Sequence, residues 1–175
     1  MTTIILTIIG ILLAAAAALM VIFYGGDAFN SGTVGAQANQ YQNAGTNVIS
    51  AVQMFKAERA TRPANINALT VAGPNGAYLD ELPALPTGVA GVLATETVGT
   101  APNVTTRDLY VVTGGGTPET QISSPVCDRI NSNLRVTPAT GAATVAAAQA
   151  LAAAAGAPKM GCYTTTAGNV FIARA

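Results

Sequence analysis

The pattern of apolar and polar positions divides the chain into three parts. Residues 1–24 are almost continuously apolar and uncharged, so they predict a helix long enough to cross the hydrocarbon core of a membrane. This helix is apolar on every face, and it therefore needs to be enclosed by lipid or by protein. Segment 25–35 begins with Gly25 and Gly26 and predicts a break or kink, because each glycine weakens a helix interior by about 1 kcal/mol. Residues 36–175 are expected to form a globular head.

The first helix presents large apolar side chains that we expect to lie in a membrane or inside a protein assembly. They are Ile4, Ile5, Leu6, Ile8, Ile9, Ile11, Leu12, Leu13, Leu19, Val21, Ile22 and Phe23. Three interpretations compete: a cleaved secretory signal, a permanent membrane anchor, and a mature chain from which a basic leader has been removed. A signal has a basic start and a shorter apolar run, and an anchor usually has a basic flank, whereas the first basic residue here is Lys56. The third interpretation is therefore favoured.

Residues 36–60 change to the pattern of an amphipathic helix. Four apolar side chains recur on one face at spacings of seven, four and three residues: Tyr41, Val48, Val52 and Phe55. We expect this face to pack on the core of the head. The last turns of this helix carry three basic residues, Lys56, Arg59 and Arg62, which suit the negative end of the helix dipole. We interpret them as a solvated helix end.

The rest of the head predicts a mixture of short helices and strands. Apolar runs predict strands at 107–113, 159–165 and 169–173, the last two joined by a turn through Ala167 and Gly168. Spacing and composition predict short helices at 65–69, 77–82, 123–134 and 142–155. In the third of these helices, Ser124 is the expected N-cap and Pro125 the first helical residue.

Composition and charge argue against several classes of function. The 175 residues are 50% apolar and only 9% charged, with no net charge and no histidine. A neutral chain lacks the basic excess with which proteins bind nucleic acid or anionic membrane surfaces. Without histidine, Ser-His-Asp and Cys-His catalysis and imidazole zinc sites are excluded. We therefore expect no enzymatic activity, no cofactor, no metal and no small-molecule substrate.

Two short motifs invite a chemical interpretation that their surroundings do not favour. The run Gly114–Gly116 lacks the lysine of a phosphate-binding loop, and Pro118 removes a backbone amide there, so the run predicts a turn. Asp80 and Glu81 are adjacent, which places their carboxyl groups on divergent sides of any regular element. We interpret them as a solvated turn and not as a catalytic pair.

The order of these parts resembles that of a mature type IV pilin. The resemblance covers the whole chain: an apolar half-helix, an amphipathic half-helix, the loop at residues 78–86 (YLDELPALP) and a late cysteine pair. Met1 as first residue and the size of the head are similar to the type IVb subgroup. The resemblance implies an α+β fold. In this fold a long N-terminal helix, apolar and then amphipathic, packs on a small antiparallel sheet.

The resemblance also implies how the chain is processed and assembled. A prepilin peptidase would cut a basic leader immediately before Met1, whose new amine is then N-methylated. The apolar helix would lie in the inner membrane until the pilus assembly machinery transfers it to the axis of a helical homopolymer. This extracellular pilus on a bacterial surface would serve adhesion, aggregation, motility or conjugative contact. The alternatives are a pseudopilin of a secretion or DNA-uptake system and a membrane-anchored periplasmic binding domain.

One position departs from the pattern of the family. Ile5 stands where the family usually carries a glutamate, whose carboxylate is thought to pair with the terminal amine of a neighbour during assembly. An isoleucine cannot form that pair, and the hydroxyls of Thr2 and Thr3 are the candidates to replace it. Both a major pilin and a minor or atypical pilin fit this departure.

The two cysteines, Cys127 and Cys162, are 35 positions apart. A metal half-site or a redox couple is one alternative, although neither cysteine belongs to a CxxC motif, and two free buried thiols are another. In a chain whose head is exported, such a pair indicates one disulfide, and the resemblance implies the same bond near the C-terminus. Closing this loop would stabilise the head by roughly 3–5 kcal/mol.

Overall fold

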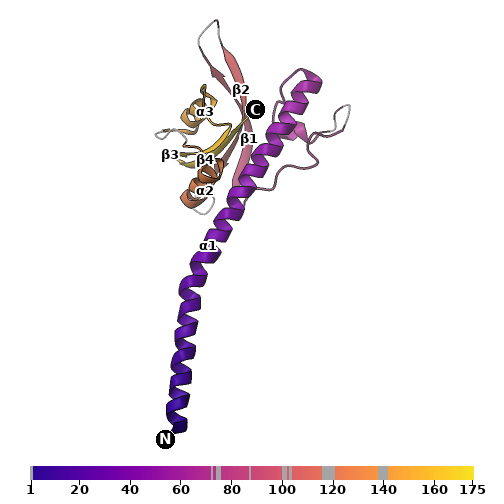
Figure 1. Ribbon diagram of the computed structural model, residues 1–175. Coiled ribbons are helices and arrows are strands. Elements are labelled where there is room, and N and C mark those ends of the chain that lie inside the picture. The colour runs from indigo at the N-terminus through magenta and orange to yellow at the C-terminus, as the bar shows by residue number, and fades with distance from the viewer. Residues whose placement is uncertain are drawn as a thin grey trace. The chain divides into compact units, whose positions relative to one another are not determined.

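The computed structural model describes residues 2–71, 73, 76–86, 88–99, 102, 104–115, 121–137 and 142–175, with only the backbone of residues 2 and 23–28. The chain divides into two compact units, Met1–Ala36 and Gln37–Ala175, each described separately below. Figure 1 labels the elements, except the short 3-10 helix η1, and their order gives the expected α+β class. They are α1 (Thr2–Arg59), η1 (Ile66–Leu69), β1 (Val89–Val98), β2 (Thr105–Gly114), α2 (Ser124–Leu134), α3 (Val145–Ala153), β3 (Met160–Thr165) and β4 (Gly168–Arg174).

Helix α1 includes the segment in which the sequence predicts a break or kink. Segment 25–35, with Gly25 and Gly26, has a helical backbone, so the helix is not interrupted there, and the kink stays a prediction. Glycine lowers helix propensity, but it keeps its backbone N–H and, unlike proline, removes no hydrogen bond from the helix. The helix ends at Arg59, before Pro63, where Ala60 takes a left-handed backbone with a φ of 50°.

The second unit is built on a four-stranded antiparallel sheet in the order β1-β2-β4-β3. The three predicted strands correspond to β2, β3 and β4, and Gly168, the first residue of β4, has the φ of 122° that favours glycine. Strand β1 was not predicted. The helix predicted at 77–82 is wrong, since these residues have no helical assignment.

Helices cover both faces of this sheet. On one face, the buried side of α1 meets β4, and the rings of Tyr41 and Phe171 lie with centroids 6.1 Å apart. The four predicted core side chains of α1 (Tyr41, Val48, Val52 and Phe55) are all buried, which confirms the amphipathic pattern. On the other face, alanines of α3 pack against Leu109 and Ile172. The sheet is therefore the middle layer of the unit, as Figure 1 shows.

The contact between α1 and the sheet is close at Gly45. A Cβ atom added at Gly45 would lie 2.9 Å from two ring carbons of Phe171 and 3.1 Å from Cβ of Ala173. Both side chains are fully buried, so neither can move aside without disturbing the core.

We expect Gly45→Val to lower the free energy of unfolding by about 2–3 kcal/mol, because it forces three carbons into a filled contact. Urea unfolding followed by circular dichroism measures the change. The matched control is Gly35→Val, where an added Cβ meets no atom within 4 Å. Equal effects of the two variants would contradict the packing argument.

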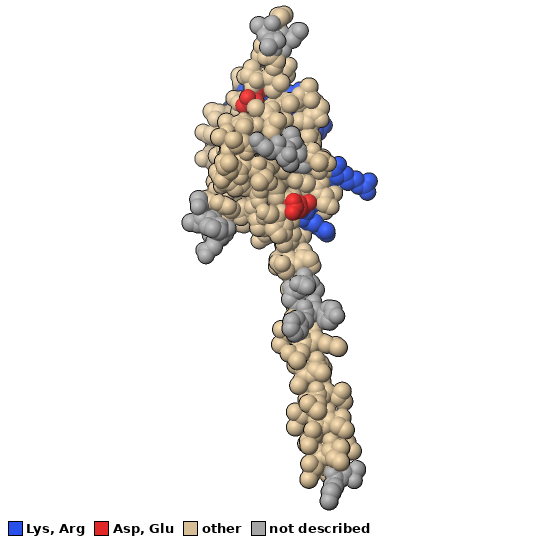
Figure 2. Space-filling view, turned by 90° about the vertical axis from the view of Figure 1, so that its left-hand side faces the viewer, with Lys and Arg blue, Asp and Glu red and all other residues tan. Residues whose placement is uncertain are grey.

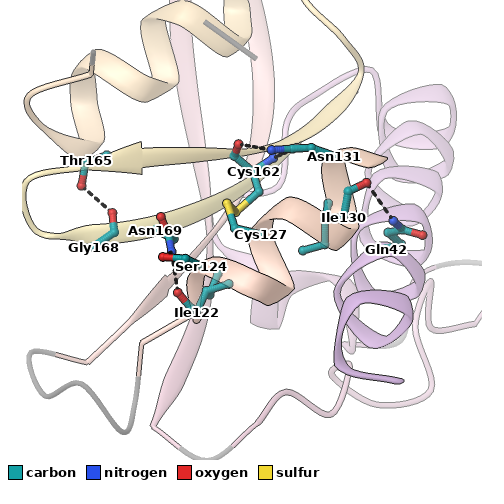
Figure 3. Close-up of a disulfide and its surroundings, with 10 residues drawn as sticks. All are labelled: Gln42, Ile122, Ser124, Cys127, Ile130, Asn131, Cys162, Thr165, Gly168 and Asn169. Carbon is teal, nitrogen blue, oxygen red and sulfur yellow. Dashed lines mark hydrogen bonds between the residues drawn. A yellow bond between two sulfur atoms is a disulfide. The ribbon is translucent and has the colours of Figure 1, made fainter. Parts of the chain in front are cut away.

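Helix α2 is tied to strand β3 by the disulfide between Cys127 and Cys162, whose Cα atoms are 5.3 Å apart. This confirms the bond expected from the sequence. Figure 3 shows the amide of Asn131 beside it, which donates to the carbonyl of Cys162 at 3.0 Å and accepts from its N–H at 2.8 Å. On the other side of α2, Gln42 of α1 donates to the carbonyl of Ile130 at 3.3 Å.

The start of α2 differs by one residue from the expected position. Ser123 is the N-cap and Pro125 is the second helical residue, so the assignment of Ser124 as N-cap is wrong. The side chain of Ser124 lies beside Asn169, and Nδ2 of Asn169 is 3.5 Å from the hydroxyl of Ser124 (Figure 3). Helix α3 is shorter than predicted and begins after Thr144, whose hydroxyl accepts from the N–H of Ala147.

Two buried tyrosines should make the second unit sensitive to alkaline pH. Burial raises the pKa of Tyr41 and of Tyr110 to about 12 because it disfavours the phenolate, and the charge of Tyr41 adds to the effect on Tyr110. In the unfolded chain both ionise near pH 10, so the unfolded state loses protons first.

Between about pH 10 and pH 12, the free energy of unfolding should therefore fall with rising pH. Each tyrosine should contribute a loss of roughly 1.4 kcal/mol per pH unit. Urea midpoints across this range, with phenolate absorbance as a monitor, test the expectation. The double variant Tyr41→Phe/Tyr110→Phe should show a flatter profile, and an unchanged slope would contradict it.

Candidate functional site: the apolar surface of helix α1

A continuous apolar surface covers residues 3–22 of the first unit. The segment Thr3–Ile22 has 20 residues with a mean hydropathy of 2.9, and none of it is buried. Residues 3–22 contain no charged residue, and Figure 2 shows no blue or red side chain on the lower part of the helix. The large apolar side chains here are 50–71% exposed: Ile4, Ile5, Leu6, Ile8, Ile9, Ile11, Leu12, Leu13, Leu19, Met20, Val21 and Ile22.

The structure places eleven of the twelve predicted side chains of this surface together on one exposed helix. The side chain of Phe23, and Met1 with its predicted N-methylation, lie outside the described residues. Met20 belongs to the same surface and was left out of the prediction. Its position within the uninterrupted apolar run was the signal that could have found it.

This surface requires an apolar cover. Twenty residues of helix span about 30 Å, which is the thickness of the hydrocarbon core, so length and composition allow the helix to cross a membrane. A cleaved signal sequence near an N-terminus meets the same criterion. The core helix of a soluble protein is mostly buried, whereas none of the apolar segment Thr3–Ile22 is buried. Soluble monomers rarely expose apolar patches larger than a few hundred Å².

The middle of the surface is lined by small side chains. Residues 14–18 are five exposed alanines, and Gly10 has no atom within 4 Å of an added Cβ. Small residues let a second helix approach closely, which strengthens dispersion contacts where no water is present. The hydroxyl of Thr7 donates to the carbonyl of Thr3 at 2.9 Å and is thereby satisfied within the helix. This surface therefore offers shape and dispersion rather than directed polar bonds.

The basic end of α1 is more structured than the solvated end that its pattern predicts. Lys56 Nζ lies 2.7 Å from Oδ2 of Asp108, and Arg62 Nε lies 3.3 Å from Oδ1 of the same carboxylate. Arg59 stacks over the ring of Phe55, with 5.0 Å from its guanidinium carbon to the ring centroid. The side chains of Lys56 and Arg62 are still more than a third exposed, as a solvated helix end would have them. What the pattern did not predict is that both side chains pair with Asp108.

We expect Asp108→Ala to lower the free energy of unfolding by about 1–2 kcal/mol. Water solvates the two released cations, which moderates the loss. The variant Asp80→Ala removes an exposed carboxylate and should have no measurable effect in the same urea titration. An Asp108→Ala variant as stable as the parent would show that these ion pairs do not stabilise the head.

A cavity of about 480 Å³ opens along this flank of α1. Its walls include Ser50, Gln53 and Lys56 of α1, Thr106 and Arg107 of β2, and Lys159 before β3. Four of the eight basic residues of the chain line it, against one of the eight acidic residues, Asp108. Basic residues therefore outnumber acidic residues in its walls, although the guanidinium of Arg174 donates to the carbonyls of Ala152, Ala154 and Ala157.

The acidic turn, Asp80 and Glu81, belongs to the loop on another side of α1. The N–H groups of Tyr78 and Leu79 both donate to the carbonyl of Leu69 at 3.0 Å, which fixes the start of the turn. The hydroxyl of Tyr78 donates to Glu58 of α1. Both acidic side chains are exposed, as predicted, and neither forms an ion pair within the part of the chain that the structure describes.

The cysteines offer no thiol chemistry, because both are in the disulfide. Among the described residues, no group of three or more His, Cys, Asp or Glu side chains could hold a metal ion. Comparisons of the chain with protein-family models, curated proteins and solved structures find no match.

Proposed function

We propose that the chain is a structural subunit that polymerises through the apolar surface of α1 into an extracellular filament of the type IV pilus kind. The observation that carries the proposal is the combination of a fully exposed, uncharged apolar helix with a head that has its own core and disulfide. The proposal gives the chain no catalytic role. Its first partner is the inner membrane and its final partner is a second copy of itself.

The physics of the helix supports both locations. In the membrane, lipid chains cover the apolar side chains, and in a bundle of copies the same side chains pack against one another. Transfer of the helix from the membrane to the bundle exposes no apolar surface to water. The helix can therefore keep the same fold in both locations. The five alanines at residues 14–18 suit close packing in the bundle.

The disulfide supports export of the head. Disulfides form and persist in the periplasm and outside the cell, and they are rare in the cytosol. A head stabilised in this way also withstands the extracellular environment, where it would form the surface of the filament. Adhesion, aggregation, motility and conjugative contact are the functions that such a surface would serve.

The experiment uses the full chain expressed in its native bacterium with Ala16→Cys, which places a thiol in the middle of the apolar surface. Filaments sheared from the cells should contain the chain. A bifunctional maleimide should then link it into ladders of dimers and higher oligomers. Detergent-dissolved monomers of the same variant are the control and should give no ladder.

Two other results would reject the proposal. A chain found only as a monomer in the inner membrane would indicate a membrane-anchored periplasmic domain. Filaments that remain in the periplasm and appear only on overexpression would indicate a pseudopilin of a secretion or DNA-uptake system. Abundance in sheared filaments separates a major from a minor subunit.

A further inference from the structure

We infer that the cationic cavity beside α1 binds the acidic turn, Asp80 and Glu81, of a second copy of this chain. The inference rests on the proposed function and adds to it a contact between heads. The apolar surface of α1 has no charged side chain among its described residues. Dispersion contacts between such helices set their axial position only weakly, so contacts between heads are needed to fix it.

Two of the cationic side chains that line the cavity, Arg107 and Lys159, form no ion pair or side-chain hydrogen bond within the described part of the chain, although Glu96 of β1 lies opposite Arg107 in the sheet register. Lys56 bonds Asp108, and Arg174 donates to the carbonyls of α3 residues Ala152 and Ala154. The pKa of Arg174 is lowered first by its burial and then by the positive charge of Arg107, which indicates repulsion between these neighbouring cations. A carboxylate placed here would relieve that repulsion.

The acidic turn has the complementary property. Asp80 and Glu81 are adjacent and exposed, so they present two carboxylates together. Hydrogen bonds from Tyr78 to Leu69 and from Gln40 to Ala84 hold the loop on both sides of them. A turn fixed in this way loses little conformational entropy on docking. The chain as a whole is neutral. The basic residues of the cavity in one copy can therefore be matched by the acidic residues of the turn in the next copy.

The two surfaces lie on different sides of α1. Gln53 lines the cavity, and Glu58 contacts Tyr78 beside the acidic turn. These two helix positions are five residues apart, which separates them by roughly 140° around the axis. A surface that binds a different surface of the next copy makes a heterologous contact, which continues as an open helical polymer instead of closing as a dimer. The arrangement is therefore that of a filament contact.

A zero-length cross-link tests the contact directly. A carbodiimide joins a carboxylate to a lysine amine only where the two touch, and Lys159 is exposed. Filaments or low-salt detergent solutions are prepared from an equal mixture of ¹⁵N-labelled and unlabelled full chain. Mass spectrometry should find Lys159 joined to Asp80 or Glu81 in peptides of mixed label. About 0.5 M NaCl should reduce their yield in detergent severalfold by screening.

Charge reversal provides the second test. Asp80→Lys/Glu81→Lys, and separately Arg107→Glu/Lys159→Glu, should each reduce filament yield about tenfold, because like charges then face each other. Combining all four substitutions should restore at least half of the yield. The control is Asp128→Lys/Arg129→Glu on the exposed face of α2, which should leave the yield unchanged. Circular dichroism confirms that each variant is folded.

The outcomes separate this inference from the proposed function. Filaments that form normally in both reversed variants and give no mixed-label cross-link would overturn the inference alone. A cavity that instead binds a small anion would make only the Arg107→Glu/Lys159→Glu variant defective, without rescue by the second reversal, and this also overturns it. If the parent chain forms no filaments, the proposed function fails, while the cross-link in detergent still tests the contact.

Discussion

Replacing Cys127 and Cys162 by alanine should lower the free energy of unfolding of the head by about 4 kcal/mol. The estimate follows from a closed loop of 35 residues, whose constraint on the unfolded chain is lost with the bond. Both cysteines are buried, so alanine also leaves small voids beside α2 and β3. Thermal unfolding followed by circular dichroism should show a midpoint roughly 10–15 °C lower.

The parent protein provides the control for this experiment. Reducing agent should lower its midpoint towards that of the Cys127→Ala/Cys162→Ala variant, and it should leave the variant unchanged. The helical signal of residues 3–22 should persist in detergent, because that segment does not contain the disulfide. A loss of less than about 1 kcal/mol would mean that Asn131 and the core hold α2 to β3 without the covalent bond.

Under the proposed function, Leu12→Arg should prevent the helix from residing in the membrane and therefore abolish filament formation. Leu12 lies near the centre of Thr3–Ile22 and is 63% exposed. Arginine at the centre of a spanning helix costs about 3 kcal/mol relative to leucine on the insertion scale. In a bundle of copies the same charge would be buried without a partner, which is also strongly unfavourable.

Fractionation of cells measures this effect. The Leu12→Arg chain should leave the membrane fraction and be absent from sheared filaments, with a loss of at least about 100-fold. Leu12→Met preserves volume and polarity and should behave like the parent. Thr97→Arg adds the same charge to an exposed position of β1 and should also be tolerated. A Leu12→Arg variant that still assembles would show that this part of the helix is not covered.

The parts of the fold that the sequence predicted correctly are those with a strong local signal. The uninterrupted apolar run specifies α1 up to Ile22, and the spacing of Tyr41, Val48 and Val52 specifies its buried face. Strands β3 and β4 and the turn between them combine apolar runs with Gly168, a residue suited to positive φ at the start of β4.

The elements that were missed depend on tertiary contacts. Strand β1 contains Gly91, which lowers its strand propensity, and a Cβ there would lie 2.6 Å from Cε2 of Tyr110. The tyrosine ring thus occupies the space of the missing side chain. Residues 77–82 are not helical because tertiary contacts hold Tyr78. Its ring packs on that of Phe55, with centroids 5.1 Å apart, and its hydroxyl donates a hydrogen bond to Glu58. Neither partner is visible in a local pattern.

The candidate surfaces show the same division. The exposed apolar side chains of α1 could be identified from the sequence because hydropathy is a property of consecutive residues. The cavity could not, since Lys56, Arg107 and Lys159 are far apart in the chain and come together only through the sheet. Asp108 is similar: its two cations come from α1 and the loop after it.

The strand order has a consequence for synthesis. Strand β4 is formed last along the chain, yet it lies between β2 and β3 in the sheet. A nascent chain that has not yet delivered Gly168–Arg174 leaves β3 without a partner strand and β2 paired only to β1. The sheet is therefore completed only after Gly168–Arg174 has been synthesised. A product truncated before β4 would leave β3 without a partner strand and the inner edge of β2 open, which makes it a substrate for proteolysis.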